Sequence, residues 1–193
     1  VDGAKAESCI VTTPYENLHI LPSSLDLAAA ELEISDKKGR ESILKNALFP
    51  IKQYYDYIII DCPPSLGLIT TNALTASDTF LVPIQCEYYA LEGLTQLMST
   101  VRRIKRQYNN TIDIEGVLLT MYDGRLNLTQ QVVEEVKKFF PRKVFKTVIP
   151  RGVRLSEAPS FGMPVIYYDK NCKGSITYTE LAKEIIAKER SYE

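Results

Sequence analysis

The segment YIIIDCPPS at residues 57–65 carries the side chain best placed to do chemistry, the carboxylate of Asp61. Its unbroken apolar run predicts a strand over 57–61 that is buried on both faces of a parallel sheet. The carboxyl ends of such strands open onto the crevice where these sheets bind ligands, and an acid there can hold Mg²⁺ beside a nucleotide phosphate. Pro63 and Pro64 restrict the loop that follows. The alternative is that Asp61 caps the next helix.

Two further loops carry residues that suit a phosphate. MYDGR at 121–125 follows a predicted strand over 114–120, and PRGVR at 150–154 follows one over 144–149. If the strands are parallel, these loops meet the loop after Asp61 at the carboxyl edge of the sheet. An acid, arginines and glycines at one edge suit a phosphate-bearing ligand. The alternative is that these arginines are simply solvated surface residues.

Strand-like and helix-like segments alternate along the chain. Helices are predicted over 25–34, 40–54, 89–107, 128–140 and 176–189, and further strands over 18–21 and 79–83. This alternation predicts an α/β fold with a mostly parallel sheet flanked by helices. No repeat or linker interrupts the pattern, so we expect a single domain over residues 1–193. Turn formers over 153–175 predict an irregular loop, a common place for function.

The composition excludes several classes of function. The net charge is −1, so attraction to nucleic acid must come from a local patch. No apolar run approaches the roughly 20 residues of a membrane span, and no signal-peptide pattern opens the chain. Cys9, Cys62, Cys86 and Cys172 lie far apart, which indicates reduced cytosolic thiols rather than zinc or disulfides. His19 is the only histidine, and we expect it to be structural.

A basic run closes the predicted helix over 89–107, with Arg102, Arg103, Lys105 and Arg106 near its end. Cations at a helix carboxyl end interact favourably with the helix dipole, and we favour this structural interpretation. A DNA backbone would also attract the same charges.

One motif expected beside such an acid is absent from the 193 residues. They contain no G-x-x-x-x-G-K-[ST] and no Gly–Lys pair. That loop cradles phosphates with backbone amides and a lysine. We therefore expect the chain as given to bind ATP poorly.

Several stretches resemble one family, in order and at its spacing. The chain is similar to the ParA/Soj chromosome- and plasmid-partitioning ATPases, in the deviant Walker A P-loop class that also holds MinD. The stretches are LPSS at 21–24, LAAAEL at 27–32, YDYIIIDCPPSLG at 55–67, VPIQCEYYALEGL at 82–94, LTMYDGR at 119–125 and IPRGVRLSEAPSFGMPV at 149–165. The segment VRLSEAPS at 153–160 is the most specific to the Soj-like branch.

The resemblance implies a P-loop NTPase-like fold and an ATP hydrolase that uses ATP and Mg²⁺. It implies a homodimer that sandwiches two nucleotides, binds DNA without sequence preference and is stimulated by a ParB/Spo0J-type centromere-binding protein. It also implies a cytoplasmic, nucleoid-associated location without membrane attachment.

The resemblance also assigns roles to nucleotide-facing residues. Asp61 looks like the catalytic switch II acid, which holds Mg²⁺ through water, and Pro63 and Pro64 form the switch that follows. Met121 and Pro150 lie where the adenine pocket of the family forms.

Two arginines and one segment correspond to binding surfaces of the family. Arg125 and Arg154 match arginines that contact DNA in the Soj branch, where contacts to phosphates give binding that is independent of sequence. Residues 87–91 lie where the dimer surface of the family runs.

The chain departs from the family in lacking its amino-terminal third, with the P-loop lysine and the switch I aspartate. We therefore expect it to be the C-terminal two-thirds to three-quarters of a ParA-type ATPase domain, and this leaves open whether the chain is itself an enzyme. One alternative is a non-catalytic remnant or regulator that binds DNA or dimerises without hydrolysing ATP. Another is MinD-like cell-division positioning. That role would need a basic amphipathic tail, and the terminal KERSYE at 188–193 does not supply one.

Overall fold

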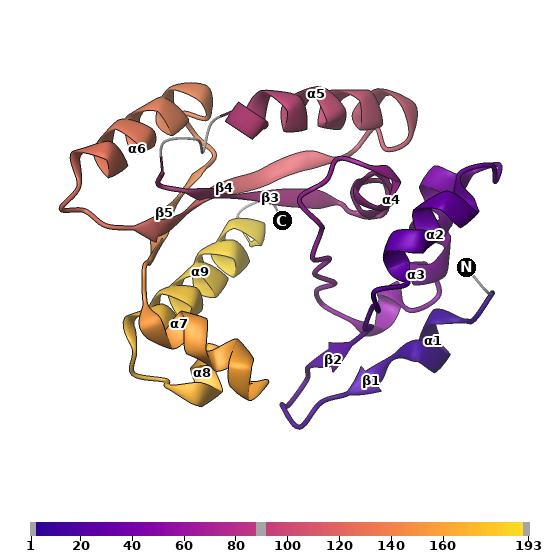
Figure 1. Cartoon of the computed structure of the whole chain (residues 1–193), viewed down its shortest axis with the longest axis horizontal. Coiled ribbons are helices and arrows are strands. Elements are labelled where there is room, and N and C mark those ends of the chain that lie inside the picture. The colour runs from indigo at the N-terminus through magenta and orange to yellow at the C-terminus, as the bar shows by residue number, and fades with distance from the viewer. Residues whose placement is uncertain (1–2, 88–91, 191–193) are drawn as a thin grey trace. The chain divides into compact units, whose positions relative to one another are not determined.

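The computed structural model describes residues 3–87 and 92–190 and is drawn in Figure 1. The chain divides into two compact units. The first unit comprises Val1–Thr79 with Leu97–Asp113, and the second comprises Phe80–Gln96 with Ile114–Glu193. The single domain expected over residues 1–193 stays a prediction.

The second unit is built on a three-stranded parallel sheet. Its strands are β3 (Thr79–Gln85), β4 (Asp113–Tyr122) and β5 (Val144–Pro150), in the order β3-β4-β5. Figure 1 places α6 (Asn127–Phe139) and α9 (Lys173–Glu189) on opposite sides of this sheet. These elements confirm the predicted α/β fold.

The core of the second unit lies where α9 packs against β5. Leu118, Phe145, Ile149 and Leu181 form a buried cluster there. On the other helix, Val132 and Val136 are buried, as expected for two positions one turn apart on an amphipathic helix.

The segment between β5 and α9 is helical rather than irregular, so our prediction of a loop over 153–175 is wrong. It forms α7 (Val153–Glu157), the 3₁₀ helix η4 (Ala158–Phe161) and α8 (Val165–Tyr168). Gly162 ends η4 with φ of 61°, a conformation that favours glycine, and Pro164 precedes α8. A Cβ on Gly174 of α9 would lie 2.6 Å from Cγ of Leu155, so α7 and α9 pack in close contact. The turn formers thus separate short helices.

The register between β4 and β5 contains an irregularity that a side chain compensates. Val117 pairs with Val144 and Leu119 with Val148, so β5 has two more residues than β4 in this interval. The N–H groups of Lys146 and Thr147 donate to the Glu184 carboxylate at 2.8 and 2.9 Å. Glu184 of α9 therefore satisfies two backbone donors at the bulge.

These contacts lower the pKa of Glu184. Burial by itself raises the pKa, but hydrogen bonds from the Lys146 and Thr147 amides, and the charge of Lys188, outweigh it. Because the pKa is lower in the folded state, the stabilisation is present above the ordinary glutamate pKa and is lost as the pH falls through the folded value.

We expect Glu184→Ala to lower the free energy of unfolding by about 1–3 kcal/mol at pH 7, since it leaves two backbone donors without their acceptor. The deficit shrinks below the folded pKa, where wild-type Glu184 is protonated. Urea denaturation at pH 7 and at a series of decreasing pH values measures both effects. Glu180→Ala is the matched control, because Glu180 is an exposed acid one turn earlier on α9. Equal destabilisation by the two variants would contradict the assigned role of Glu184.

The first unit is mainly helical. Its elements are α1 (Ala6–Cys9), β1 (Val11–Thr12), β2 (His19–Ile20), α2 (Leu27–Ile34), η1 (Arg40–Ser42), α3 (Ile43–Leu48), η2 (Lys52–Tyr54), α4 (Leu68–Ala76) and the later part of α5 (Glu92–Gln107). Buried Ala6, Leu48 and Ile51 form its core cluster. The helix predicted over 40–54 is broken into three pieces, and the break after Leu48 follows because Pro50 cannot continue a helix.

The strand predicted over 57–61 is absent, so this prediction is wrong. Ile59 is 92% exposed, and no described strand pairs with the segment. An apolar run becomes a buried strand only where neighbouring strands supply hydrogen bonds and cover its faces. The strand predicted over 18–21 shrinks to His19–Ile20, which pairs antiparallel with β1 in a hairpin.

Two minor predictions concern the cysteines and the histidine. All four cysteines are free. His19 hydrogen-bonds through Nδ1 to the Tyr55 hydroxyl at 2.9 Å, as expected for a structural residue.

Among residues 3–87 and 92–190, no helix has the length and apolar character needed to cross a membrane.

Candidate functional site

The carboxyl ends of β4 and β5 lie side by side in the second unit. Tyr122 pairs with Pro150 in the parallel ladder. The loop residues 121–125 and 150–154 therefore leave the same edge of the sheet, as expected from the sequence. This edge carries four of the predicted site residues: Met121, Arg125, Pro150 and Arg154.

Met121 has an unusual backbone conformation, with φ of 52°. A left-handed conformation costs a side-chain-bearing residue roughly 1–2 kcal/mol. Met121 is 40% exposed near the end of β4. Strain of this kind often lies at ligand sites, and here it coincides with a residue that the resemblance places in the adenine pocket.

Arg125 is held by Asp123, two residues earlier. Its Nε and Nη2 atoms donate to the two carboxylate oxygens at 2.9 and 2.7 Å, and its backbone N–H donates to Oδ1 at 3.1 Å. Hydrogen bonds from Arg125 lower the pKa of Asp123 to about 2. The pKa of Arg125 is raised by the same contact. The Arg125 side chain is 89% exposed, so the pair faces water.

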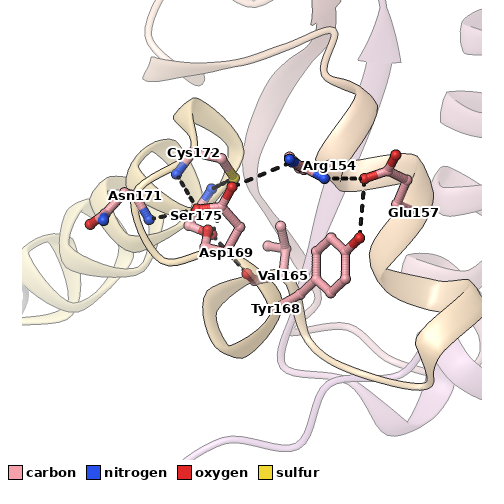
Figure 2. A network of polar contacts seen from close by, with 8 residues as sticks. All are labelled: Arg154, Glu157, Val165, Tyr168, Asp169, Asn171, Cys172 and Ser175. Atoms are coloured by element: carbon pink, nitrogen blue, oxygen red, sulfur yellow. Dashed lines mark hydrogen bonds and ion pairs between the residues drawn. The ribbon is translucent and has the colours of Figure 1, made fainter.

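Arg154, the first-turn arginine of α7, lies between two carboxylates (Figure 2). Its Nη1 donates to Glu157 at 2.8 Å, and its Nε lies 3.5 Å from Oδ2 of Asp169. The guanidinium lies 6.0 Å from the Tyr168 ring centre, and the Tyr168 hydroxyl donates to Glu157 at 3.2 Å. The Glu157 hydrogen bond and charge, with a contribution from Tyr168, raise the pKa of Arg154.

Asp61 lies in the first unit and does not cap the next helix. The helix α4 begins after Gly67, and the Ile69 N–H donates to Oε1 of Glu31 on α2 at 3.0 Å. A Cβ on Gly67 would require the Glu31 carboxylate to shift, so this carboxylate lies close against the start of the helix. The alternative interpretation of Asp61 as a helix cap is therefore wrong.

The Asp61 side chain is exposed, and within the described part of the chain nothing pairs with its carboxylate. Pro63 and Pro64 follow it in an exposed stretch without regular structure. Among residues 3–87 and 92–190, no group of three or more His, Cys, Asp or Glu could hold a metal directly. One unpaired carboxylate fits a Mg²⁺ held through water, the arrangement that the resemblance implies.

Two further predictions concern surfaces. Arg102, Arg103, Lys105 and Arg106 are all exposed on α5, which fits both the structural interpretation that we favour and a DNA-facing one. Of the segment 87–91, predicted to contribute to a dimer surface, Glu87 is exposed and residues 88–91 lie outside the described part of the chain.

The acidic partners of the two arginines were not predicted. The spacing of Glu157, three residues after Arg154 on a helix, is a signal that could have been used. Asp123, two residues before Arg125, is part of a turn sequence, DGR at 123–125. Asp169 lies fifteen positions after Arg154 in the sequence, so no local pattern indicates their contact.

Comparison with known proteins identifies the family to which the chain is similar. Residues 1–114 match a family described as an AAA domain. The chain is 58% identical over 187 residues to the sporulation initiation inhibitor protein Soj of Bacillus subtilis, covering 97% of the chain and 74% of that protein. It is 50% identical over 177 residues to the chromosome partitioning protein ParA of Myxococcus xanthus, covering 92% of the chain and 62% of that protein.

A solved structure supports the fold. It is cobyrinic acid a,c-diamide synthase from Mycobacterium smegmatis with bound ADP and magnesium, and it matches with a TM-score of 0.84 and 32% identity. The match covers 98% of this chain and 70% of that one.

Proposed function

This chain belongs to the Soj/ParA family of chromosome-partitioning ATPases, and from that premise we propose that it hydrolyses ATP, dimerises with ATP and binds DNA without sequence preference. The observation that carries the proposal is 58% identity to Soj over 97% of the chain. A ParB/Spo0J-type centromere-binding protein stimulates hydrolysis in this proposal. The location is cytoplasmic and nucleoid-associated.

The proposed cofactors are ATP and Mg²⁺. Asp61 holds the ion through water, and Pro63 and Pro64 limit the conformations of the chain beside it. Met121 and Pro150 form part of the adenine pocket, which is supported by their position at one edge of the sheet. A bound Mg²⁺ would supply positive charge that offsets the negative charge developing on the phosphate during transfer. Asp61 orients the hydration shell of the ion.

The proposed DNA surface includes Arg125 and Arg154, one on each of the loops at the edge of the sheet. Both are exposed, and neither is built into a core. Arginines that meet phosphates without reading bases give binding that is independent of sequence and sensitive to salt.

We further propose that the 193 residues are the C-terminal two-thirds to three-quarters of one ParA-type domain. The matched region spans 74% of the Soj protein and 62% of the ParA protein.

The proposed ATPase function is tested by measuring ATP turnover of the protein expressed from its whole reading frame, alone, with DNA, and with DNA and the ParB-type protein. We expect slow turnover alone and a marked increase with both additions. Unchanged turnover would contradict the proposal.

One sequence observation favours a second candidate, a non-catalytic regulator that binds DNA or dimerises without hydrolysis. The 193 residues contain no Gly–Lys pair and hence no P-loop lysine. Calorimetry with Mg-ATP separates the candidates, comparing the 193-residue chain with the product of the whole reading frame. Binding by the longer product alone supports the ATPase. Failure of both to bind supports the regulator.

The strained position of Met121 supplies a prediction for the nucleotide pocket. We expect Met121→Gly to weaken ATP binding several-fold because it removes a side chain from the adenine pocket. Relief of left-handed strain and the greater freedom of glycine in the unfolded chain oppose each other, so the free energy of unfolding changes by less than about 1 kcal/mol. Calorimetry and urea denaturation measure the two quantities. Unchanged affinity would remove Met121 from the pocket.

A further inference from the structure

We propose that Asp123, and separately Glu157 with Asp169, act as internal competitors of DNA that hold Arg125 and Arg154 until a phosphate displaces them. The inference rests on the proposed DNA-binding function and deepens it, since it assigns to these acids control over the affinity of the surface. It is supported independently at two places in the second unit.

At the first place, Asp123 occupies the donors of Arg125 that a phosphate would use. Nε and Nη2 donate in a fork to the two carboxylate oxygens. Arginine binds phosphate oxygens with the same fork geometry, so the carboxylate and a phosphate compete for the same donors. Because the Arg125 side chain is 89% exposed, a phosphate can reach the guanidinium without unfolding the loop.

At the second place, two carboxylates face one guanidinium, so the cluster of Arg154, Glu157 and Asp169 carries a formal charge of −1. Figure 2 shows the contacts of Asp169 with its neighbours. Its Oδ1 accepts hydrogen bonds from the backbone N–H groups of Asn171 and Cys172, both at 3.1 Å, while Oδ2 faces the arginine. Asp169 therefore keeps its place when the arginine turns toward a phosphate.

The competition has a limited size because the pairs are exposed to water. Exposed ion pairs are weak and are screened by salt. The acids therefore lower DNA affinity by a modest factor rather than blocking the surface, and a duplex with many phosphates can displace them. The low pKa of Asp123, about 2, means that the carboxylate stays charged throughout the physiological pH range.

The test uses Asp123→Ser in the protein expressed from its whole reading frame. Serine removes the charge but can still accept the hydrogen bond from the Arg125 N–H, and it avoids the labile Asn–Gly sequence that asparagine would create before Gly124. With Mg-ATP and a random-sequence duplex at low salt, we expect binding tighter by about two- to fivefold. Glu157→Gln should give a gain in the same direction, while keeping an acceptor for the Tyr168 hydroxyl.

The matched control is Glu135→Gln. Glu135 pairs with Lys138 on α6 of the same unit, so the variant makes the same change in net charge away from both arginines. In an Arg125→Ala background, Asp123→Ser should lose its local effect and give no more gain than this control.

Four outcomes would overturn the inference. Equal gains from Asp123→Ser and Glu135→Gln would show that removing a negative charge anywhere on the unit tightens DNA binding. Weaker binding by Asp123→Ser would show that the acid positions the arginine for DNA instead of competing with DNA. If the wild type binds DNA and neither Asp123→Ser nor Glu157→Gln changes the affinity, the inference is wrong while the proposed function stands. Absence of DNA binding by the wild type would instead overturn the proposed function and, with it, this inference.

Discussion

Replacing Arg125 and Arg154 together with alanine is expected to abolish retention of non-specific DNA while leaving ATP-driven dimerisation intact. Removal of one arginine–phosphate pair lowers the slope of log affinity against log salt by about 0.9, so removal of two from each protomer of the proposed dimer, four in all, lowers it by about 3.6. Filter binding across a salt series measures this change. Sedimentation with Mg-ATP measures dimerisation.

The double arginine variant has a matched control in Arg142→Ala. Arg142 is also an exposed arginine of the second unit, and it lies outside both loops at the edge of the sheet. Its replacement should lower affinity only slightly. If the double variant retains DNA at low salt as well as the wild type does, the proposed DNA surface is wrong. Loss of both DNA binding and dimerisation would indicate a structural defect instead.

Replacing Asp61 with alanine is expected to lower Mg²⁺-dependent ATP turnover about a hundredfold or more, in the protein expressed from its whole reading frame. A metal ion supplies several kcal/mol of charge stabilisation, and each 1.36 kcal/mol corresponds to a factor of about ten. Because Asp61 is exposed and unpaired among the described residues, its removal should change stability by less than about 0.5 kcal/mol. Steady-state turnover and urea denaturation measure the two quantities.

Asp56→Ala is the control for this variant, since Asp56 is an exposed acid five residues earlier in the same segment. It should leave turnover unchanged. Raising the Mg²⁺ concentration should restore part of the activity of Asp61→Ala if the acid serves to hold the ion. Normal turnover in Asp61→Ala at ordinary Mg²⁺ would remove this residue from the site.

The strands and the long helices of the second unit could be predicted from the sequence because their patterns are local, whereas the short helices α7, η4 and α8 were not predicted. The strand predicted over 114–120 is observed as Asp113–Tyr122, and the helix predicted over 128–140 as Asn127–Phe139. Both have apolar residues at the period that their own packing requires. The parallel pairing of β4 with β5 then brings two of the three predicted loops to one edge.

The first unit was predicted less well because its structure depends on distant partners. The apolar run over 57–61 lacks a pairing strand among the described residues. The helix α4 was missed because its sequence, LITTNALTA, shows no amphipathic pattern. Its polar residues are buried because they are hydrogen-bonded: Asn72 accepts from the Leu44 N–H and donates to the Arg40 carbonyl. Such contacts join residues about thirty positions apart, which periodicity does not record.

The candidate site, too, could be predicted only in part from the sequence. The sequence indicated which residues to consider, including Asp61, Arg125 and Arg154. It did not indicate the left-handed backbone at Met121, nor the contact between Arg154 and Asp169. The first is a backbone conformation and the second is a contact between residues fifteen positions apart, and neither has a local pattern in the sequence.

The measurement that tests the proposed function most directly is the affinity of the protein for a random-sequence DNA duplex, compared between Mg-ATP and Mg-ADP at several salt concentrations. A Soj/ParA-type partitioning ATPase should bind the duplex tightly with Mg-ATP, weakly with Mg-ADP, and less tightly as salt increases. The same affinity with both nucleotides, or absence of DNA binding with either, would contradict the proposed function.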